Sequence, residues 1–205
     1  IGNLTNDGEW SYSWRHGREL ASMTKGATTW NYTYNADGIR TSKTIDGITH
    51  EYTLRGSLIM SEKWTQNNVE HLLMYLYDET GAPIGLQYRN SSYAVSEYDL
   101  YFFEKNLQGD IIAITNNKGK VVASYTYDAW GNILTKSGDL AELNPFRYRT
   151  YYFDNETWFY YLQSRYYDPA IGRFINADVL YSTGQGILGN NMFAYCNNNP
   201  VMGYD

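Results

Sequence analysis

The sequence is poor in the residues that mark several common classes of protein. Among its 205 residues there are one cysteine, three histidines and four prolines. The single cysteine, Cys196, excludes an internal disulfide framework. The histidines at positions 16, 50 and 71 show no cluster typical of a zinc site. We therefore expect no metal and no cofactor, and we interpret Cys196 as a small packing residue because every histidine lies far upstream.

Charge is also scarce. Asp, Glu, Lys and Arg make up 19% of the chain, and the net charge is −6. Basic stripes are absent, which argues against nucleic acid as a partner of this segment. No apolar run is long enough for a transmembrane helix. The polar segment 1–8 lacks an initiator Met and the basic flank of a signal peptide, so we expect a fragment of a longer protein.

Aromatic residues and glycine are abundant. The chain has 22 Tyr, 7 Phe, 6 Trp and 18 Gly. Tyrosine combines a large apolar ring with one polar tip, and it favours the half-buried surface of a pleated sheet. Together with the low proline content, this composition predicts an all-β fold.

A repeat runs through the chain. The pattern Tyr-x-Tyr-Asp/Asn-x-x-Gly begins at Tyr32, Tyr75 and Tyr125, and degenerate copies begin at Tyr101 and Tyr151. The spacing is roughly 20 to 26 residues, which is typical of a repeat protein.

Each part of the repeat has a physical reason. Two tyrosines separated by one residue face the same side of a strand. The Asp or Asn that follows ends the strand by bonding nearby backbone, and the Gly supplies a positive φ for the return. Each repeat should therefore form about one hairpin, and consecutive hairpins should pair into one continuous sheet. We interpret these Tyr and Asp residues as packing and turn residues without a catalytic role.

The last third of the chain carries a more specific signature. The segment 160–178, YYLQSRYYDPAIGRFINAD, resembles the core-associated motif of the YD-repeat, or Rhs, family, and 189–200 continues it. The resemblance covers about 120–205, whereas 10–120 matches only the looser repeat. It implies a hollow shell built from a spiralling β-strip and closed by its terminal module. We expect a YD-repeat strip over 1–139, with a short helical turn near 138–143, and an Rhs-associated core over 140–205.

The resemblance also implies a function. Such shells hold an unfolded or partly folded C-terminal toxin and deliver it to competing cells or to a host. The expected partners are a covalently linked toxin cargo, upstream repeats of the same protein and an immunity protein for the cargo. The expected location is secreted or at the bacterial cell surface.

The resemblance maps a self-cleaving site onto Arg165 and Asp178. Asp205 matches the family motif at the cut site, although the Pro-x-Gly-Leu expected next is absent, and Asp168 is a less favoured second carboxylate. Two carboxylates held close share one proton, so one can activate water while the other polarises the scissile carbonyl. A guanidinium can hold a carboxylate or steady the developing oxyanion. We expect at most single-turnover aspartyl autoproteolysis and no multiple-turnover enzyme.

Each site residue has a structural alternative. Asp168 precedes a proline and fits a turn, Asp178 fits a cap or turn, and Arg165 could stack between tyrosines. The sequence departs from the family at Val179, where many members have Pro. It also departs at Trp158, where a turn Gly is common, and there we expect an altered hairpin.

One rival function stays open. A cell-surface repeat module without catalysis could use exposed Tyr and Trp side chains to bind carbohydrate or a protein partner. A free enzyme is disfavoured because the sequence offers no nucleophile–base pair. The Gly-rich stretch 184–189 lacks the strand-to-helix context of a phosphate loop and is interpreted as irregular.

Overall fold

The chain forms two antiparallel sheets, as a computed structural model that describes residues 2–178 and 191–203 shows. Twelve strands pair strictly in chain order in the larger sheet, and four pair in chain order in the smaller one. The prediction of an all-β strip of hairpins is confirmed. Within the described residues the only helical elements are two three-residue 3-10 turns, η1 (Tyr148–Thr150) and η3 (Cys196–Asn198).

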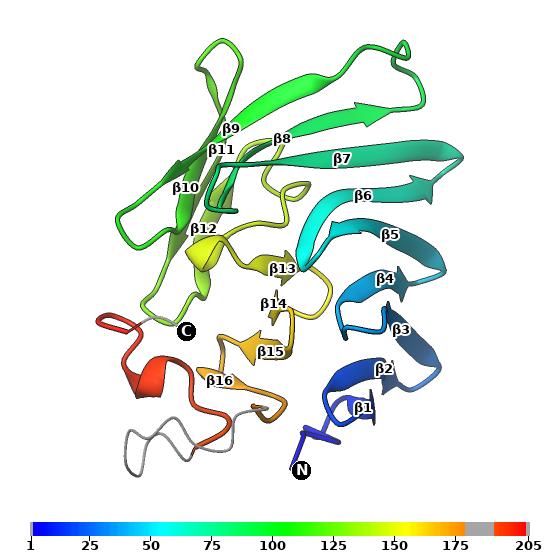
Figure 1. Cartoon of the computed structure of the whole chain (residues 1–205), viewed down its shortest axis with the longest axis vertical. Helices are drawn as coiled ribbons and strands as arrows, with labels where there is room; N and C mark the ends of the chain where they lie inside the picture. The colour runs from blue at the N-terminus through cyan, green and yellow to red at the C-terminus, as the bar shows by residue number, and fades with distance from the viewer. Residues whose placement is uncertain (1, 179–190, 204–205) are drawn as a thin grey trace.

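The larger sheet consists of β1 (Ser11–Arg15), β2 (Glu19–Lys25), β3 (Thr28–Tyr34), β4 (Arg40–Ile45), β5 (Ile48–Arg55), β6 (Leu58–Gln66), β7 (Val69–Tyr77), β8 (Pro83–Asn90), β9 (Asp99–Lys105), β10 (Ile111–Asn116), β11 (Val121–Tyr127) and β12 (Ile133–Ser137). The smaller sheet consists of β13 (Tyr152–Asp154), β14 (Phe159–Leu162), β15 (Arg165–Asp168) and β16 (Arg173–Phe174). We call the larger sheet the strip and the smaller sheet the plug. The strip follows a curved path, and the plug lies on the inside of the curve (Figure 1). The strip does not close, because β1 and β12 do not pair.

The predicted turns form with one repeated geometry. A single side-chain oxygen, Oδ1, accepts the backbone N–H groups two and four residues later, and the glycine three residues later has a positive φ. Five turns share this arrangement, beginning at Asn35, Asp78, Asn106, Asn116 and Asp128. The turn interpretation of these Asp and Asn residues is therefore confirmed.

The two tyrosines of each clear repeat have different tasks. The first, at Tyr32, Tyr75 and Tyr125, is buried in the core. The second donates its hydroxyl to a backbone carbonyl of the neighbouring strand beside a register shift. These bonds are Tyr34 to Leu20 (3.0 Å), Tyr77 to Ile59 (2.6 Å) and Tyr127 to Ile111 (2.8 Å). A bulge disrupts the backbone ladder, so the hydroxyl supplies a partner to a carbonyl at that point.

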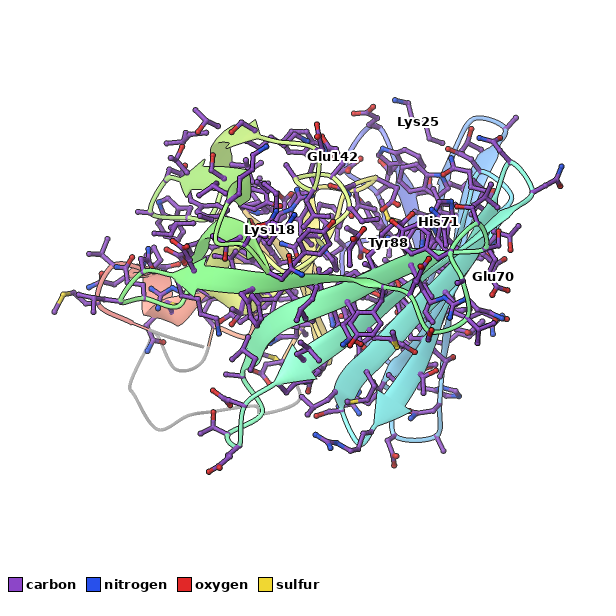
Figure 2. The ribbon with its side chains drawn as sticks, turned by 90° about the horizontal axis from the view of Figure 1, so that it is seen from above. Lys25, Glu70, His71, Tyr88, Lys118 and Glu142 are labelled. Atoms are coloured by element: carbon purple, nitrogen blue, oxygen red, sulfur yellow. The ribbon has the colours of Figure 1, made fainter. Side chains whose placement is uncertain are left out.

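A column of stacked rings crosses the strip. His50, Trp64, His71 and Tyr88 come from β5, β6, β7 and β8, with adjacent ring centroids 4.9–6.0 Å apart. The Nδ1 atom of His71 lies 2.8 Å from the Tyr88 hydroxyl, and Figure 2 shows these two side chains together. Burial and the nearby charge of His50 lower the pKa of His71.

The plug is covered on both faces. Tyr152, Tyr161 and Tyr166 pack with the core residues of the strip, whereas Tyr160 and Tyr167 pack in a second cluster with Tyr195. Hydroxyl contacts also join the two sheets, for example Tyr34 to Tyr166 at 2.7 Å. The plug strands therefore read as nearly continuous aromatic runs without the alternation of the strip.

Two smaller expectations have definite outcomes. Residues 138–143 form hydrogen-bonded turns, with the Ala141 N–H donating to Gly138 O at 3.1 Å, and not a helix. Trp158 takes a φ of 64°, the conformation that glycine favours, and the β13–β14 hairpin still pairs Asp154 with Phe159. None of the described helical segments could span a membrane.

Candidate functional site

Arg165 and Asp178 form an ion pair. Arg165 begins β15, and its Nη1 atom lies 2.9 Å from Oδ2 of Asp178. Both side chains are largely buried, with exposed fractions of 14% and 26%. The Arg165 guanidinium also stacks on the ring of Phe174, 3.6 Å from its centroid. The structure thus brings together two of the three site residues that the sequence predicted.

Asn176 holds the two partners in position. It is completely buried, and its side chain is bonded to the backbone on both sides of Arg165. Oδ1 accepts the N–H of Tyr166 at 2.8 Å, and Nδ2 donates to the Ser164 carbonyl at 2.9 Å. These two bonds hold the segment that carries Asp178 next to the start of β15. The sequence interpretation missed this residue, although it stands inside the Phe-Ile-Asn-Ala-Asp motif.

A cavity of about 330 Å³ lies between strip and plug and is bordered by Arg165. Its walls come from the β5–β6 and β7–β8 turns of the strip and from residues 150–152 and 161–165 of the plug. This volume is within the usual range for ligand pockets, roughly 300–1,000 Å³. Arg165 is the one charged residue among the described residues that line the cavity.

The described part of the C-terminal segment, 191–203, returns to the plug. The Asp178 N–H donates to Met192 O at 3.0 Å, and the Phe174 N–H donates to Phe193 O at 3.0 Å. Tyr195 is fully buried with its ring centroid 4.1 Å from that of Tyr167. Cys196 is buried in the same cluster, which agrees with its interpretation as a packing residue. The backbone of Asp178 is therefore tied to the segment that precedes Asp205.

Asp168 does not join Arg165. Side chains alternate along a strand, so these two residues, three apart on β15, project from opposite faces. The Asp168 carboxylate accepts the N–H of Ala170 at 2.8 Å, as the turn interpretation predicted. Burial, together with the charge of Asp7, raises the pKa of Asp168. Asp205, Val179 and the stretch 184–189 lie outside the described residues.

A second group of charges is buried between strip and plug. Arg40 and Asp154 form a two-bonded pair, Nη1–Oδ2 at 2.6 Å and Nη2–Oδ1 at 3.0 Å. Lys43 bonds both Asp154 (3.1 Å) and Glu156 (3.0 Å). A register shift between β3 and β4 turns Arg40 and Lys43 to the same side of β4, although they are three residues apart.

Aromatic rings enclose the guanidinium of Arg40. Its Cζ atom lies 4.3 Å from the ring centroid of Tyr161. Four further rings stand 5.1–5.9 Å away, those of Tyr32, Tyr52, Tyr152 and Tyr166. Burial alone would raise the pKa of the Asp154 carboxyl, but the charges of Arg40 and Lys43 lower it below its ordinary value. Arg40 and Lys43 come from the strip and Asp154 from the plug, and all three are buried, so we interpret the arrangement as a lock between the two sheets.

Asp154 ends β13 and its carbonyl accepts the Trp158 N–H at 2.9 Å, but its side chain does not bond the backbone of the turn as the repeat predicted. This degenerate repeat copy has Thr157 where the other turns have glycine, so the usual turn cannot form there. The carboxylate bonds to Arg40 and Lys43 instead.

Glu62 extends the lock along the strip. It is buried on β6, accepts the hydroxyls of Tyr75 and Tyr152 at 2.8 Å each, and lies 2.7 Å from Nδ1 of His50. Burial would raise the pKa of this carboxyl, but the bond to His50 and the charge of Lys43 lower it. Among the described residues, no group of three or more His, Cys, Asp or Glu side chains could hold a metal ion.

Comparison with known proteins gives consistent matches. The family model of the Teneurin YD-shell matches residues 65–201. The tRNA nuclease WapA of Bacillus subtilis is 36% identical over the whole chain, and the toxin protein Tse5 of Pseudomonas aeruginosa is 30% identical over 55% of it. The chain spans only 9% and 8% of the length of these two relatives. In the crystal structure of TcdB2-TccC3-Cdc42, 10% of the solved chain superposes on this entire chain with a TM-score of 0.83 at 20% identity, which shows a shared fold.

Proposed function

This chain belongs to the YD-shell family, and on that basis we propose that it is the C-terminal part of a shell that encloses a toxin and cuts itself once to free the cargo. The observation that carries the proposal of self-cleavage is the Arg165–Asp178 pair beside the cavity. The backbone of Asp178 is also hydrogen-bonded to the returning C-terminal segment. The relatives named as a toxin and as a tRNA nuclease support the proposal that the shell encloses a toxin.

The architecture suits a wall. The strip is curved and open. Within the described chain β12 leaves one edge unpaired, and the outer edge of β1 meets only the short segment 5–7. An open edge readily accepts another strand, so upstream repeats can continue the sheet from β1. We assign residues 1–139 to this wall and 140–205 to the processing module. The cargo would be a toxin joined covalently after the module, with an immunity protein as its partner, in a secreted or surface-bound bacterial protein.

The proposed reaction is hydrolysis of one peptide bond. Asp178 takes a proton from a water molecule, whose oxygen attacks the scissile carbonyl carbon. A second carboxylic acid, which we assign to Asp205 from the family motif, gives its proton to the carbonyl oxygen and takes one back when the gem-diol collapses. As the C–N bond breaks, Asp178 passes the proton taken from water to the leaving nitrogen. The products are a new carboxylate and a free amine. Arg165 holds the Asp178 carboxylate in place and stabilises the negative charge that develops on oxygen.

The experiment follows the processing of a full-length chain that continues past Asp205. Wild type and the variants Asp178→Asn, Arg165→Ala and Asp139→Asn are expressed, and the fragments are identified by intact-mass spectrometry. Asp139 is an exposed carboxylate in the turns after β12, so its amide variant is the matched control. We expect complete cleavage in wild type and the control, none in Asp178→Asn, and strongly slowed cleavage in Arg165→Ala. Normal cleavage of Asp178→Asn would remove that residue from the mechanism.

The rival function receives less support from the described residues. A carbohydrate-binding face needs several exposed aromatic rings close together. Among the described residues, only Tyr98, Phe102 and Trp158 are aromatic residues with exposed fractions above 40%. Tyr98 and Phe102 lie just before and on β9, and Trp158 lies in the β13–β14 turn. Most of the other described tyrosines are buried in the core or donate their hydroxyls to backbone carbonyls.

A further inference from the structure

Arg149 is hydrogen-bonded to the segment 200–203, which leads to the predicted cut site. Its Nη2 atom donates to the backbone carbonyls of Pro200 at 2.6 Å and of Gly203 at 3.3 Å. Nη1 lies 3.5 Å from the carbonyl of Gln108 in the β9–β10 turn. One side chain thus connects the β9–β10 turn of the strip with the end of the described chain. Neither the repeat nor the core motif pointed to this residue.

The side chain of Arg149 is fixed before it meets this segment. Its backbone has a φ of 52°, and its N–H donates to Oδ1 of Asp110 at 2.9 Å. The guanidinium lies 5.6 Å from the ring centroid of Tyr148, and its side chain is only 12% exposed. Nε is 3.9 Å from the Asp110 carboxylate, which is longer than the bonds to the carbonyls. The guanidinium therefore bonds the carbonyls of the returning segment more closely than it approaches the Asp110 carboxylate.

The segment itself is shaped to be held. The Gly203 N–H donates to Asn199 O at 2.8 Å, which closes a turn whose two carbonyls face the guanidinium. A Cβ atom on Gly203 would stand 2.9 Å from Asn199 O and 3.1 Å from Cys196 Cβ, so a larger residue would force the turn open. At its other end the same segment is bonded through Met192 O to the N–H of Asp178.

We propose that Arg149 is a positioning residue for self-cleavage, one that fixes the chain directly before the cut site so that one peptide bond is presented to the Arg165–Asp178 pair. The inference rests on the proposed function. A cut within one chain depends on how the bond is held, and a displacement of about 1 Å costs on the order of 100-fold in rate. A planar guanidinium holds its donors in a fixed geometry, whereas a lysine ammonium is a compact charge on a flexible stem.

The test compares Arg149→Ala, Arg149→Lys and Gly203→Ala with wild type in the full-length chain. Arg15→Ala is the control, because Arg15 is an exposed arginine on β1. Three quantities are measured for each: the rate of cleavage across pH, the bond cut, from the mass of the released fragment, and the melting temperature. We expect Arg149→Ala and Gly203→Ala to slow cleavage by about 10- to 100-fold and to give more than one cut bond. The shape of the pH profile should not change, since Arg149 exchanges no proton.

The outcomes separate the two proposals. Partial recovery of rate and of the single cut bond in Arg149→Lys supports positioning, because lysine restores the charge and its donors but not the fixed planar geometry. Wild-type rate and cut bond in folded Arg149→Ala would overturn the role of Arg149 while Asp178→Asn still blocks cleavage. If Arg149→Ala fails to fold, Gly203→Ala decides in the same way, because it opens the turn and leaves the arginine intact. An uncut wild-type chain would refute the proposed self-cleavage itself.

Discussion

Arg40 and Asp154 are 114 residues apart in the sequence and form a two-bonded ion pair that is sealed from solvent between strip and plug. Their side chains are 0% and 1% exposed. Two charges cost several kcal/mol each to bury, and only close pairing with further hydrogen bonds offsets this. Lys43 and the surrounding tyrosines supply those contacts. The pair therefore specifies how the plug docks, because any other docking would leave a bare charge inside.

Breaking this pair should destabilise the protein strongly. In Asp154→Ala the charges of Arg40 and Lys43 lose their buried partner, and we expect the free energy of unfolding to fall by about 3–5 kcal/mol. Replacing both members, as in Arg40→Met with Asp154→Leu, should cost less than Asp154→Ala alone, because the charge of Arg40 is gone and Lys43 keeps Glu156. Denaturant unfolding of the two variants measures this. The matched control is the exposed pair Lys63–Glu70 at 3.4 Å, whose loss should cost at most about 1 kcal/mol. Equal costs for the buried and exposed pairs would contradict the lock.

Acid should unfold the protein through Glu62 and Asp154. Both carboxyls have pKa values below their ordinary 4.5 and 3.8, because His50, Arg40 and Lys43 favour the charged forms despite burial. The unfolded chain therefore binds protons first as the pH falls. Stability from these groups is fully present above about pH 5 and is lost as the pH falls through 4.5 and 3.8 toward the folded values.

Melting temperature against pH checks this. We expect a plateau near neutrality and a steep decline in acid. Glu62→Gln should melt lower than wild type at pH 7 and decline less steeply in acid, because it has one fewer carboxylate to protonate. Glu70→Gln, on an exposed residue of β7, should leave the curve of wild type unchanged. A wild-type melting temperature that stays constant down to pH 3 would rule out the linkage.

The hairpins could be predicted because their signals are local. A Tyr-x-Tyr pair, an Asp or Asn and a glycine three residues later settle one strand end and one turn, and the strand order follows from chain order. The lock could not be predicted, since nothing near Arg40 in the sequence points to Asp154. Only the docking of the plug brings them together.

The candidate site stands between these cases. Arg165 and Asp178 were identified from the family resemblance, and spacing alone would not have paired them. Their contact depends on the β15–β16 hairpin and on Asn176, whose bonds to the backbone on both sides of Arg165 have no local pattern. The contact of Arg149 with Pro200 and Gly203 joins residues more than 50 positions apart, and the sequence gives no hint of it.

The repeated turn makes a substitution test possible at Asn116. Its Oδ1 accepts the N–H groups of Lys118 and Lys120, both at 3.0 Å. Asn116→Ala removes the acceptor for both, and we expect a loss of about 1–2 kcal/mol in the free energy of unfolding. Asn116→Asp keeps the acceptor and should stay within about 0.5 kcal/mol of wild type, because Asp78 and Asp128 already serve in the same position. Chemical denaturation distinguishes them. An aspartate variant as unstable as the alanine variant would show that the shared geometry is not what matters.

Gly131 is where a strip turn meets the plug, and it should tolerate no side chain. Its φ is 91°, and a Cβ atom there would lie 2.6 Å from Cδ1 of Tyr148. Its carbonyl also accepts the hydroxyl of Tyr160 at 2.8 Å, so a shift of the turn would cost that bond as well. We expect Gly131→Ala to lower the free energy of unfolding by about 2–4 kcal/mol, from the strained backbone and the overpacked ring together. Gly119→Ala is the control, because Gly119 has a φ of 74° but nothing within 4 Å of its Cβ position, so only the backbone cost of about 1–2 kcal/mol applies. Equal losses of stability in the two variants would contradict the close packing of the Tyr148 ring against this turn, and with it the docking of the plug at Gly131.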